Sequence, residues 1–193
     1  MKDEATYAKR ITLVAVIVFI GLLYISFRIL GFPAGLFSTT FIGGLIVWLS
    51  TTYRISVDPH KFISLYLLTV ILFIVHVYEE FRGHIETVMS RLTGLQVTQQ
   101  NFLTIAAFIA PITWVTGALL TFKRWRFGEF LVSVFLFGMM FGELTHFVFP
   151  LMLDGRFHYM AGMYTCLLPS VSAWCTFFTI RSEVQKALQW SCS

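Results

Sequence analysis

Long apolar runs alternate with short polar segments along the whole chain, and six of these runs approach the length of a membrane-spanning helix. A bilayer core about 30 Å thick needs about 20 apolar residues of helix to cross it. The pattern therefore predicts one all-α, polytopic integral membrane bundle over residues 1–193, with no separate soluble domain. The predicted spans cover residues 11–30, 36–50, 61–80, 101–122, 127–149 and 159–180.

Proline and glycine residues set the predicted ends and contacts of these spans. Pro150 is expected to end the fifth span, because proline lacks the N–H that a continuing helix needs. Pro111 predicts a kink within the fourth span. Gly43 and Gly44 suit close contact with a neighbouring helix. The polar stretch 81–100 predicts a short interfacial helix followed by a loop.

Composition and charge support the membrane class and give the bundle an orientation. The chain is 57% hydrophobic and 12% charged, and its net charge of +4 is spread over the predicted loops, which argues against a nucleic-acid partner. Positive residues concentrate on the cytoplasmic side of membrane proteins. Ten of the 14 Lys and Arg residues share the side of the two termini, so we expect both termini in the cytoplasm and the protein in the plasma membrane. The other four are Arg28, Arg82, Arg91 and Arg156.

Two polar motifs end apolar runs, and they carry the strongest functional signal. HVYEE (residues 76–80) ends the third predicted span, and ELTH (residues 143–146) lies near the end of the fifth. Charged side chains are costly at membrane depth and need a partner, water or a metal ion. Residues three and four apart share one helix face, so each motif presents its imidazole and a carboxylate together. In the predicted topology both motifs lie at extracytoplasmic helix ends, where we expect them to meet in one buried site.

This combination of imidazoles and carboxylates predicts a divalent metal site. Glu-x-x-His pairs on helices hold the ions of di-iron and di-manganese carboxylate proteins, and the same donors suit zinc. A binuclear iron or zinc centre is therefore an expected cofactor. The expected ligands are His76, Glu79, Glu80, Glu143 and His146, with His84 and His158 as additional ligands or hydrogen-bonding partners. The alternative is structural: charges at 76–80 solvated among lipid headgroups, and an ion pair within 143–146.

The same residues carry a resemblance to a known family. HVYEE at 76–80, a later helix ending in His146 and the segment YMAGMYT at 159–165 resemble the integral membrane family named for its HXXEE motif. The resemblance covers about residues 65–179. Members of the family usually have Pro-Gly where this chain has Ala-Gly, at 161–162. The resemblance implies a shared site at these residues and does not supply a reaction.

The first functional hypothesis is a membrane-embedded metalloenzyme that acts on a lipid or isoprenoid from the outer half of the bilayer. Iron would imply oxygen-dependent chemistry. Zinc would imply hydrolysis, with Glu80 as general base and Tyr159 as a catalytic hydrogen-bond donor.

Three alternatives use the same residues differently. A metal-free isoprenoid cyclase would use Glu79 or Glu80, kept protonated by burial, as its acid. Ionisable groups in spans also mark proton or ion transporters. However, no polar residues continue a path through the cytoplasmic halves of the third and fifth spans, and the sequence shows no internal repeat. Haem held by two histidines is the third alternative, and it leaves the carboxylates without a role.

Overall fold

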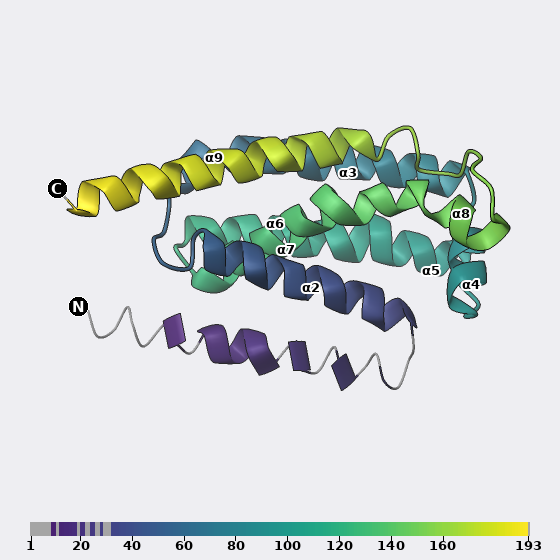
Figure 1. The fold of residues 1–193 in the computed structure, drawn as a ribbon, viewed down its shortest axis with the longest axis horizontal. Coiled ribbons are helices and arrows are strands. Elements are labelled where there is room, and N and C mark those ends of the chain that lie inside the picture. The colour runs from purple at the N-terminus through teal and green to yellow at the C-terminus, as the bar shows by residue number, and fades with distance from the viewer. Residues whose placement is uncertain are drawn as a thin grey trace.

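The computed structural model describes residues 9–192 except 11, 19, 22, 23, 26, 27 and 29–31, and this part of the chain is helical with no β-strand (Figure 1). The all-helical prediction is confirmed for these residues. The longer helices are α2 (Phe32–Ser50), α3 (Ile63–Arg82), α6 (Ala110–Phe122), α7 (Arg126–Phe137) and α9 (Leu167–Cys192). The shorter elements are η1 (Pro59–Lys61), α4 (Ile85–Thr93), α5 (Gln99–Leu103), η2 (Thr104–Ile109), η3 (Gly138–Gly142), η4 (Glu143–Phe147) and α8 (Phe149–Asp154).

Three continuous helical stretches of the described chain are long and apolar enough to cross a membrane. They are Ile63–Arg82, Gln99–Phe122 and Arg126–Asp154, and a shorter apolar helix covers Thr39–Ser50. The three stretches coincide with the third, fourth and fifth predicted spans and indicate membrane association. A total of six spans stays a prediction, and the first of them, 11–30, lies partly outside the described residues.

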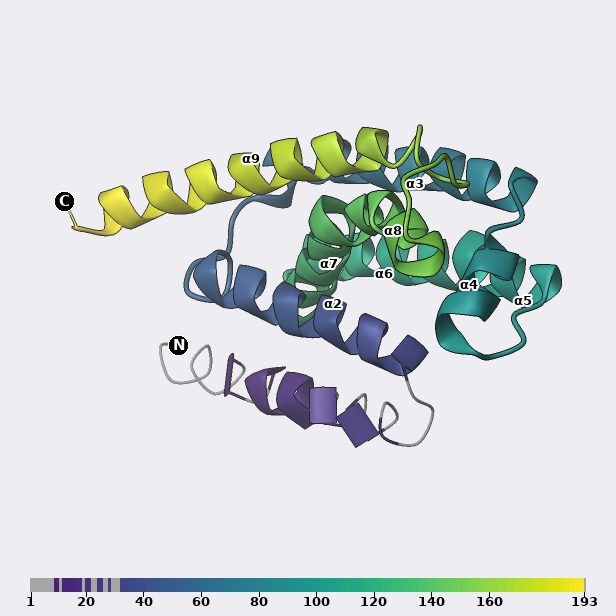
Figure 2. The same cartoon turned by 45° about the vertical axis from the view of Figure 1, so that its right-hand side comes forward.

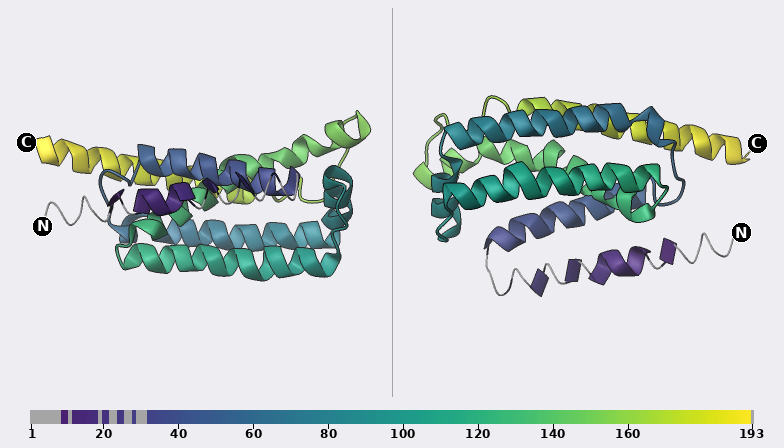
Figure 3. Two further views of the ribbon diagram at one scale, coloured as in Figure 1. Left: turned by 90° about the horizontal axis from the view of Figure 1, so that it is seen from below. Right: turned by 180° about the vertical axis from the view of Figure 1, so that it is seen from behind.

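α7 is the central helix of the bundle, because α2 and α6 both pack closely against it (Figure 2). Every residue from Gly128 to Leu136 is buried. A Cβ atom on Gly44 of α2 would lie 2.4 Å from the Cα atom of Val134, which confirms the predicted close contact at this glycine. α3 and α9 lie side by side along one edge of the bundle, and α4 stands across its end (Figure 3).

The segment before α9 differs most from the prediction. α9 begins at Leu167 and not at Tyr159, because residues 155–166 are not helical: they form a bend, an irregular stretch at 157–160 and turns at 161–166. Gly162 within this segment has a φ of +92°, which a continuing α-helix does not contain. α9 also continues to Cys192, beyond residue 180, where the sixth predicted span ends.

Two prolines mark changes of helix geometry. The prediction that Pro150 ends the fifth helical stretch is wrong: Pro150 lies in the first turn of α8, where a missing N–H costs no hydrogen bond. Pro111 lies in the first turn of α6, directly after η2, which is a π-helix. A second π-helical segment, η3, follows α7. Such wide turns are rare in proteins overall, and those that occur are often at functional sites.

Candidate metal centre

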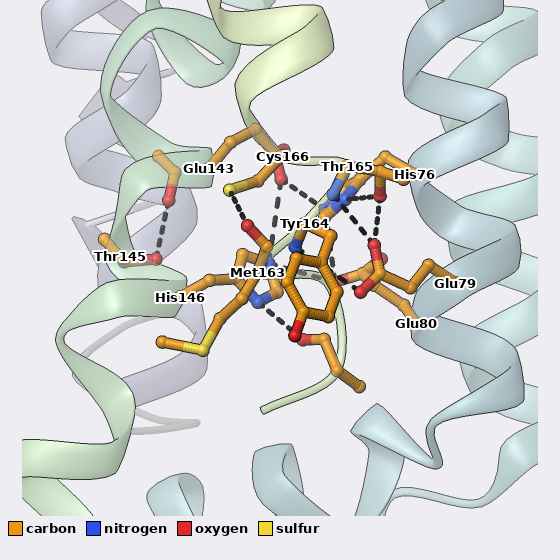
Figure 4. Close-up of polar contacts among 12 residues, drawn as sticks. His76, Glu79, Glu80, Glu143, Thr145, His146, Met163, Tyr164, Thr165 and Cys166 are labelled. Carbon is orange, nitrogen blue, oxygen red and sulfur yellow. Dashed lines mark hydrogen bonds and ion pairs between the residues drawn. The ribbon is translucent and has the colours of Figure 1, made fainter. Parts of the chain in front are cut away.

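Four side chains from two helical stretches converge at the end of the bundle that carries α4 and α8 (Figures 1 and 4). α3 contributes His76 and Glu80, one turn apart on one face. η4 contributes Glu143 and His146, and its 3₁₀ geometry aligns residues three apart. The two imidazoles are buried, and the side chains of Glu80 and Glu143 are only 12% and 13% exposed. The structure therefore brings the two sequence motifs together.

The Nε2 atoms of the two histidines face the two carboxylates at short range. His76 Nε2 lies 2.7 Å from Glu143 Oε2 and 3.6 Å from Glu80 Oε1. His146 Nε2 lies 3.2 Å from Glu80 Oε1 and 3.7 Å from Glu143 Oε2. Ligand atoms held about 2.0–2.1 Å from one ion lie about 2.9 Å apart in octahedral and about 3.4 Å apart in tetrahedral geometry. The four observed separations bracket these values.

The hydrogen bond at the other ring nitrogen fixes the tautomer of His146. Its Nδ1 atom lies 2.9 Å from the carbonyl oxygen of Ala161. A carbonyl oxygen can only accept, so Nδ1 carries the proton and donates. In a neutral imidazole, Nε2 then presents a lone pair, and this lone pair faces Glu80 and Glu143.

His76 is fixed in the same tautomer by a longer chain of hydrogen bonds. Its Nδ1 atom lies 3.0 Å from Thr165 Oγ1, and this hydroxyl donates its one proton to Glu79 Oε2 at 2.5 Å. The hydroxyl oxygen must therefore accept from His76 Nδ1–H. Histidines that bind metals typically donate their second ring N–H in this way, which holds the ring in place.

With both imidazoles neutral, two Nε2 lone pairs and two carboxylates face one small volume, and a cation between them would balance their negative charge. His76 Nε2 is buried without any partner of hydrogen-bond geometry, although Glu143 Oε2 is 2.7 Å away. One ligand atom each from His76, Glu80 and His146 lie within 4.8 Å of one another. Two imidazole nitrogens with carboxylate oxygens are donors that suit iron, manganese or zinc. The donor set therefore fits a divalent metal ion.

Glu79, which the sequence predicted as a ligand, has a different position. Its carboxylate accepts hydrogen bonds from the Tyr159 hydroxyl at 2.6 Å, from Thr165 Oγ1 and from the Thr165 N–H at 2.9 Å. Tyr159 lies in the segment between α8 and α9, and its hydrogen bond to Glu79 raises the pKa of the phenol to about 12. The phenol therefore stays protonated at neutral pH and continues to donate. Glu79 and Tyr159 stabilise the segment that holds His76.

His84 and His158, the two additional predicted ligands, have other partners. His84 Nδ1 lies 3.1 Å from Glu86 Oε1, at the start of α4. His158 Nε2 lies 3.4 Å from Asp154 Oδ2, at the end of α8. Both belong to the surface of this end of the bundle rather than to the group formed by His76, Glu80, Glu143 and His146.

Sequence reasoning missed the roles of three residues between α8 and α9. The Ala161 carbonyl fixes His146, the Thr165 hydroxyl fixes His76, and Gly162 lies against both rings. A Cβ atom on Gly162 would lie 2.6 Å from His146 Cε1 and 2.8 Å from His76 Cε1. The sequence signal for these roles was the YMAGMYT segment at 159–165, because Gly162 and the Thr165 hydroxyl occur there directly before an apolar helix.

An apolar cavity of about 240 Å³ opens from the site into the bundle. Glu80, Glu143 and His146 line one end of it. Phe73, Trp114 and Phe135 line the part farther from the carboxylates, and their rings pack in pairs with centroids 5.1 to 5.9 Å apart. An engineered apolar cavity of about 150 Å³ is large enough to bind benzene. The space beside the site can therefore hold an apolar group larger than benzene.

Comparisons with protein-family models, with curated proteins and with solved structures found no match to this chain. The resemblance to the HXXEE family therefore stays a prediction. The chemistry of the site must be argued from its own geometry.

Replacing Thr165 with valine tests whether the hydroxyl positions His76. Thr165→Val keeps the side-chain shape and removes both the acceptor for His76 Nδ1–H and a donor to Glu79. Loss of such an outer partner weakens metal binding by about 10–100-fold. The measurement is the metal dissociation constant, obtained by competition with a chelating dye. Thr179→Val is the matched control, because the Thr179 hydroxyl bonds only to the Cys175 carbonyl of its own helix; an equal loss in both variants would contradict the positioning role.

Proposed function

We propose that this protein is a membrane-embedded metalloenzyme with one divalent ion, acting on an apolar lipid or isoprenoid substrate. One observation carries the proposal: the Nδ1–H groups of His76 and His146 both donate hydrogen bonds to other parts of the protein. In the neutral imidazoles this leaves both Nε2 lone pairs directed at the carboxylates of Glu80 and Glu143. His76, His146 and one of the two carboxylates, Glu80 or Glu143, would hold the ion.

The position of Glu79 favours one ion over the predicted binuclear centre. Helical di-iron centres use two histidines and four carboxylates. Of the carboxylates in the described part of the chain, only Glu80 and Glu143 face the two Nε2 atoms, since Glu79 accepts hydrogen bonds from Tyr159 and Thr165. Two imidazoles and one carboxylate leave open positions on iron in oxygenases and on zinc in hydrolases.

The second carboxylate has the geometry of a general base. Glu80 and Glu143 both line the cavity, and each lies within 3.7 Å of an imidazole Nε2 atom. A bound ion would supply a Lewis acid and an activated oxygen ligand. The carboxylate that does not coordinate it would accept a proton at the cavity end, next to the reacting group of a substrate.

Charge distribution supports an extracytoplasmic position for the site. The basic turn 123–126 lies at the opposite end of the bundle from α4 and α8. Under the positive-inside rule this basic end and the two termini face the cytoplasm. The metal centre would then lie near the outer surface of the membrane.

The second candidate function uses the same residues without a metal. The 2.7 Å separation between His76 Nε2 and Glu143 Oε2 also suits a pair that shares a proton. Such a pair, at the end of an apolar cavity, would protonate an alkene and remove a proton elsewhere, as an isomerase or cyclase requires. Transport has less support, because the far end of the cavity is lined by Phe73, Trp114 and Phe135.

Metal analysis of the purified protein separates the two candidates. We expect close to one equivalent of iron, zinc or manganese per chain. Dialysis against a chelator should remove the ion together with activity, and adding back the one metal found should restore both. Protein that stays fully active with no metal would contradict the metalloenzyme and favour the proton-sharing pair.

A further inference from the structure

The cavity beside the site has its polar groups at one end and an apolar wall elsewhere. Apart from Glu80, Glu143, His146 and two threonines, its lining residues are apolar, and they come from α2, α3, α4, η2, α6, α7, η3 and α8. On α3 it reaches from Phe73 to Glu80, about 10 Å at 1.5 Å rise per residue. This depth is a large part of one leaflet, since a bilayer core is about 30 Å thick.

One side of this cavity is formed by α2 and the stretch α5–η2–α6. Both elements pack closely on α7, whereas the described residues of the two make few close contacts with each other. Thr40 and Phe41 of α2 line the cavity on one side, and Ile105, Ala106 and Ala110 line it on the other. The stretch Gln99–Phe122 is largely exposed, so the boundary between α2 and α5–η2–α6 faces the lipid.

Small residues and wide helical turns create the space. The two π-helical segments, η2 and η3, both contribute to the lining. Gly142 at the end of η3 has helical backbone angles, and a Cβ atom there would meet no atom within 4 Å. The volume beside the carboxylates is therefore open at this position, and a Cβ atom there would enter it without a clash.

The charges at the site select against anionic headgroups. Among the residues that the structure describes, no Lys or Arg lines the cavity, whereas Glu80 and Glu143 both do. Glu79 adds a third carboxylate nearby. One divalent ion balances two of these charges, so a phosphate at this end would still face excess negative charge.

We infer that the cavity binds the single apolar chain of an uncharged lipid, such as a long-chain alcohol, aldehyde or prenyl compound, and not an intact phospholipid. The chain reaches the cavity from the bilayer between α2 and α5–η2–α6. Its reactive end lies at Glu80, Glu143 and His146. This inference rests on the proposed function, because it names the class of substrate for the same site.

Photo-crosslinking in purified, metal-loaded protein tests the inference without an activity assay. The probe is a long-chain alcohol with a diazirine in its chain, compared with a phosphatidylcholine carrying the same group. We expect the alcohol to label cavity-lining residues of η2, α6 and η3, and the phospholipid to label only lipid-facing positions. Gly142→Leu should lower the cavity labelling at least about fivefold while metal content is kept, as overfilling predicts.

Two controls make the result decisive. Gly21→Leu adds the same side chain at another glycine with open space around it, outside the cavity lining, and should leave labelling unchanged. His146→Ala should remove the metal and keep the labelling, so failure of the chain site and failure of the metal centre are distinguishable. Unchanged cavity labelling in Gly142→Leu, or equal cavity labelling by the phospholipid, would overturn the inference. A further outcome is that the wild-type protein binds no metal but its cavity is labelled by the alcohol, and Gly142→Leu loses this labelling. That result would contradict the metalloenzyme and support the binding site for the apolar chain.

Discussion

His76→Ala and His146→Ala are each expected to abolish stoichiometric metal binding and activity. Each substitution removes one of two imidazole Nε2 atoms that lie within 3.7 Å of both carboxylates. The remaining histidine and two carboxylates then have too few nitrogen donors to hold a borderline ion tightly. We expect less than about a tenth of the wild-type metal content after purification, because loss of even an outer partner costs about 10–100-fold in affinity. The measurement is metal content per chain alongside turnover.

Two histidines that do not face the site serve as matched controls. His60 packs against Phe122 at the other end of the bundle, and His158 pairs with Asp154 at the surface. His60→Ala and His158→Ala should keep wild-type metal content. If the four alanine variants lose metal to the same degree, the assignment of ligands is wrong.

Gly162→Ala is the methyl addition that is expected to disturb the two site imidazoles directly. The new Cβ atom would lie 2.6 Å from His146 Cε1, 2.7 Å from His146 Nδ1 and 2.8 Å from His76 Cε1. Both rings would have to move, which breaks the His146 bond to the Ala161 carbonyl and the His76 bond to Thr165. We expect loss of metal binding and a lower melting temperature, since overpacking and a disfavoured positive φ each cost about 1–3 kcal/mol.

A second glycine separates the steric effect from the backbone effect. Gly155 also has a positive φ, of +65°, but a Cβ atom there would meet nothing within 4 Å. Gly155→Ala should therefore lower the melting temperature modestly and leave metal content intact. Equal metal loss in both variants would show that the backbone, and not contact with the imidazoles, explains the Gly162 effect.

Hydrophobic pattern was sufficient to predict the helical bundle, because the length and apolarity of a helix are properties of a continuous stretch. The three membrane-length stretches coincide with the predicted spans at 61–80, 101–122 and 127–149. Spacing within the motifs also predicted that His76 and Glu80 share one face, and the structure places both opposite Glu143 and His146. Three- and four-residue spacing on a helix is local geometry, so it can be derived without knowledge of the fold.

The segment between α8 and α9 was not predictable in the same way. Its turns depend on contacts with distant residues: Glu79 accepts hydrogen bonds from Tyr159 and from the Thr165 N–H, which lie 80 and 86 positions away. Glu79 was predicted to be a ligand because it lies three residues from His76 and so shares its helix face, yet its carboxylate accepts hydrogen bonds from Tyr159 and Thr165. His84 was added because a longer helix would continue the 76, 80, 84 stripe, but α3 ends at Arg82 and His84 has a positive φ. His158 was added because of its predicted membrane depth, which does not determine the direction of a side chain.

X-ray absorption spectroscopy of the metal in the purified wild-type protein tests the proposed centre most directly. We predict a first shell of nitrogen and oxygen donors at about 2.0–2.2 Å from the metal. The spectrum should also contain the outer-shell scattering of two imidazole rings, and this scattering should be lost in His76→Ala and in His146→Ala. A first shell containing sulfur at about 2.3 Å, a spectrum without imidazole scattering, or protein that binds no metal would contradict it.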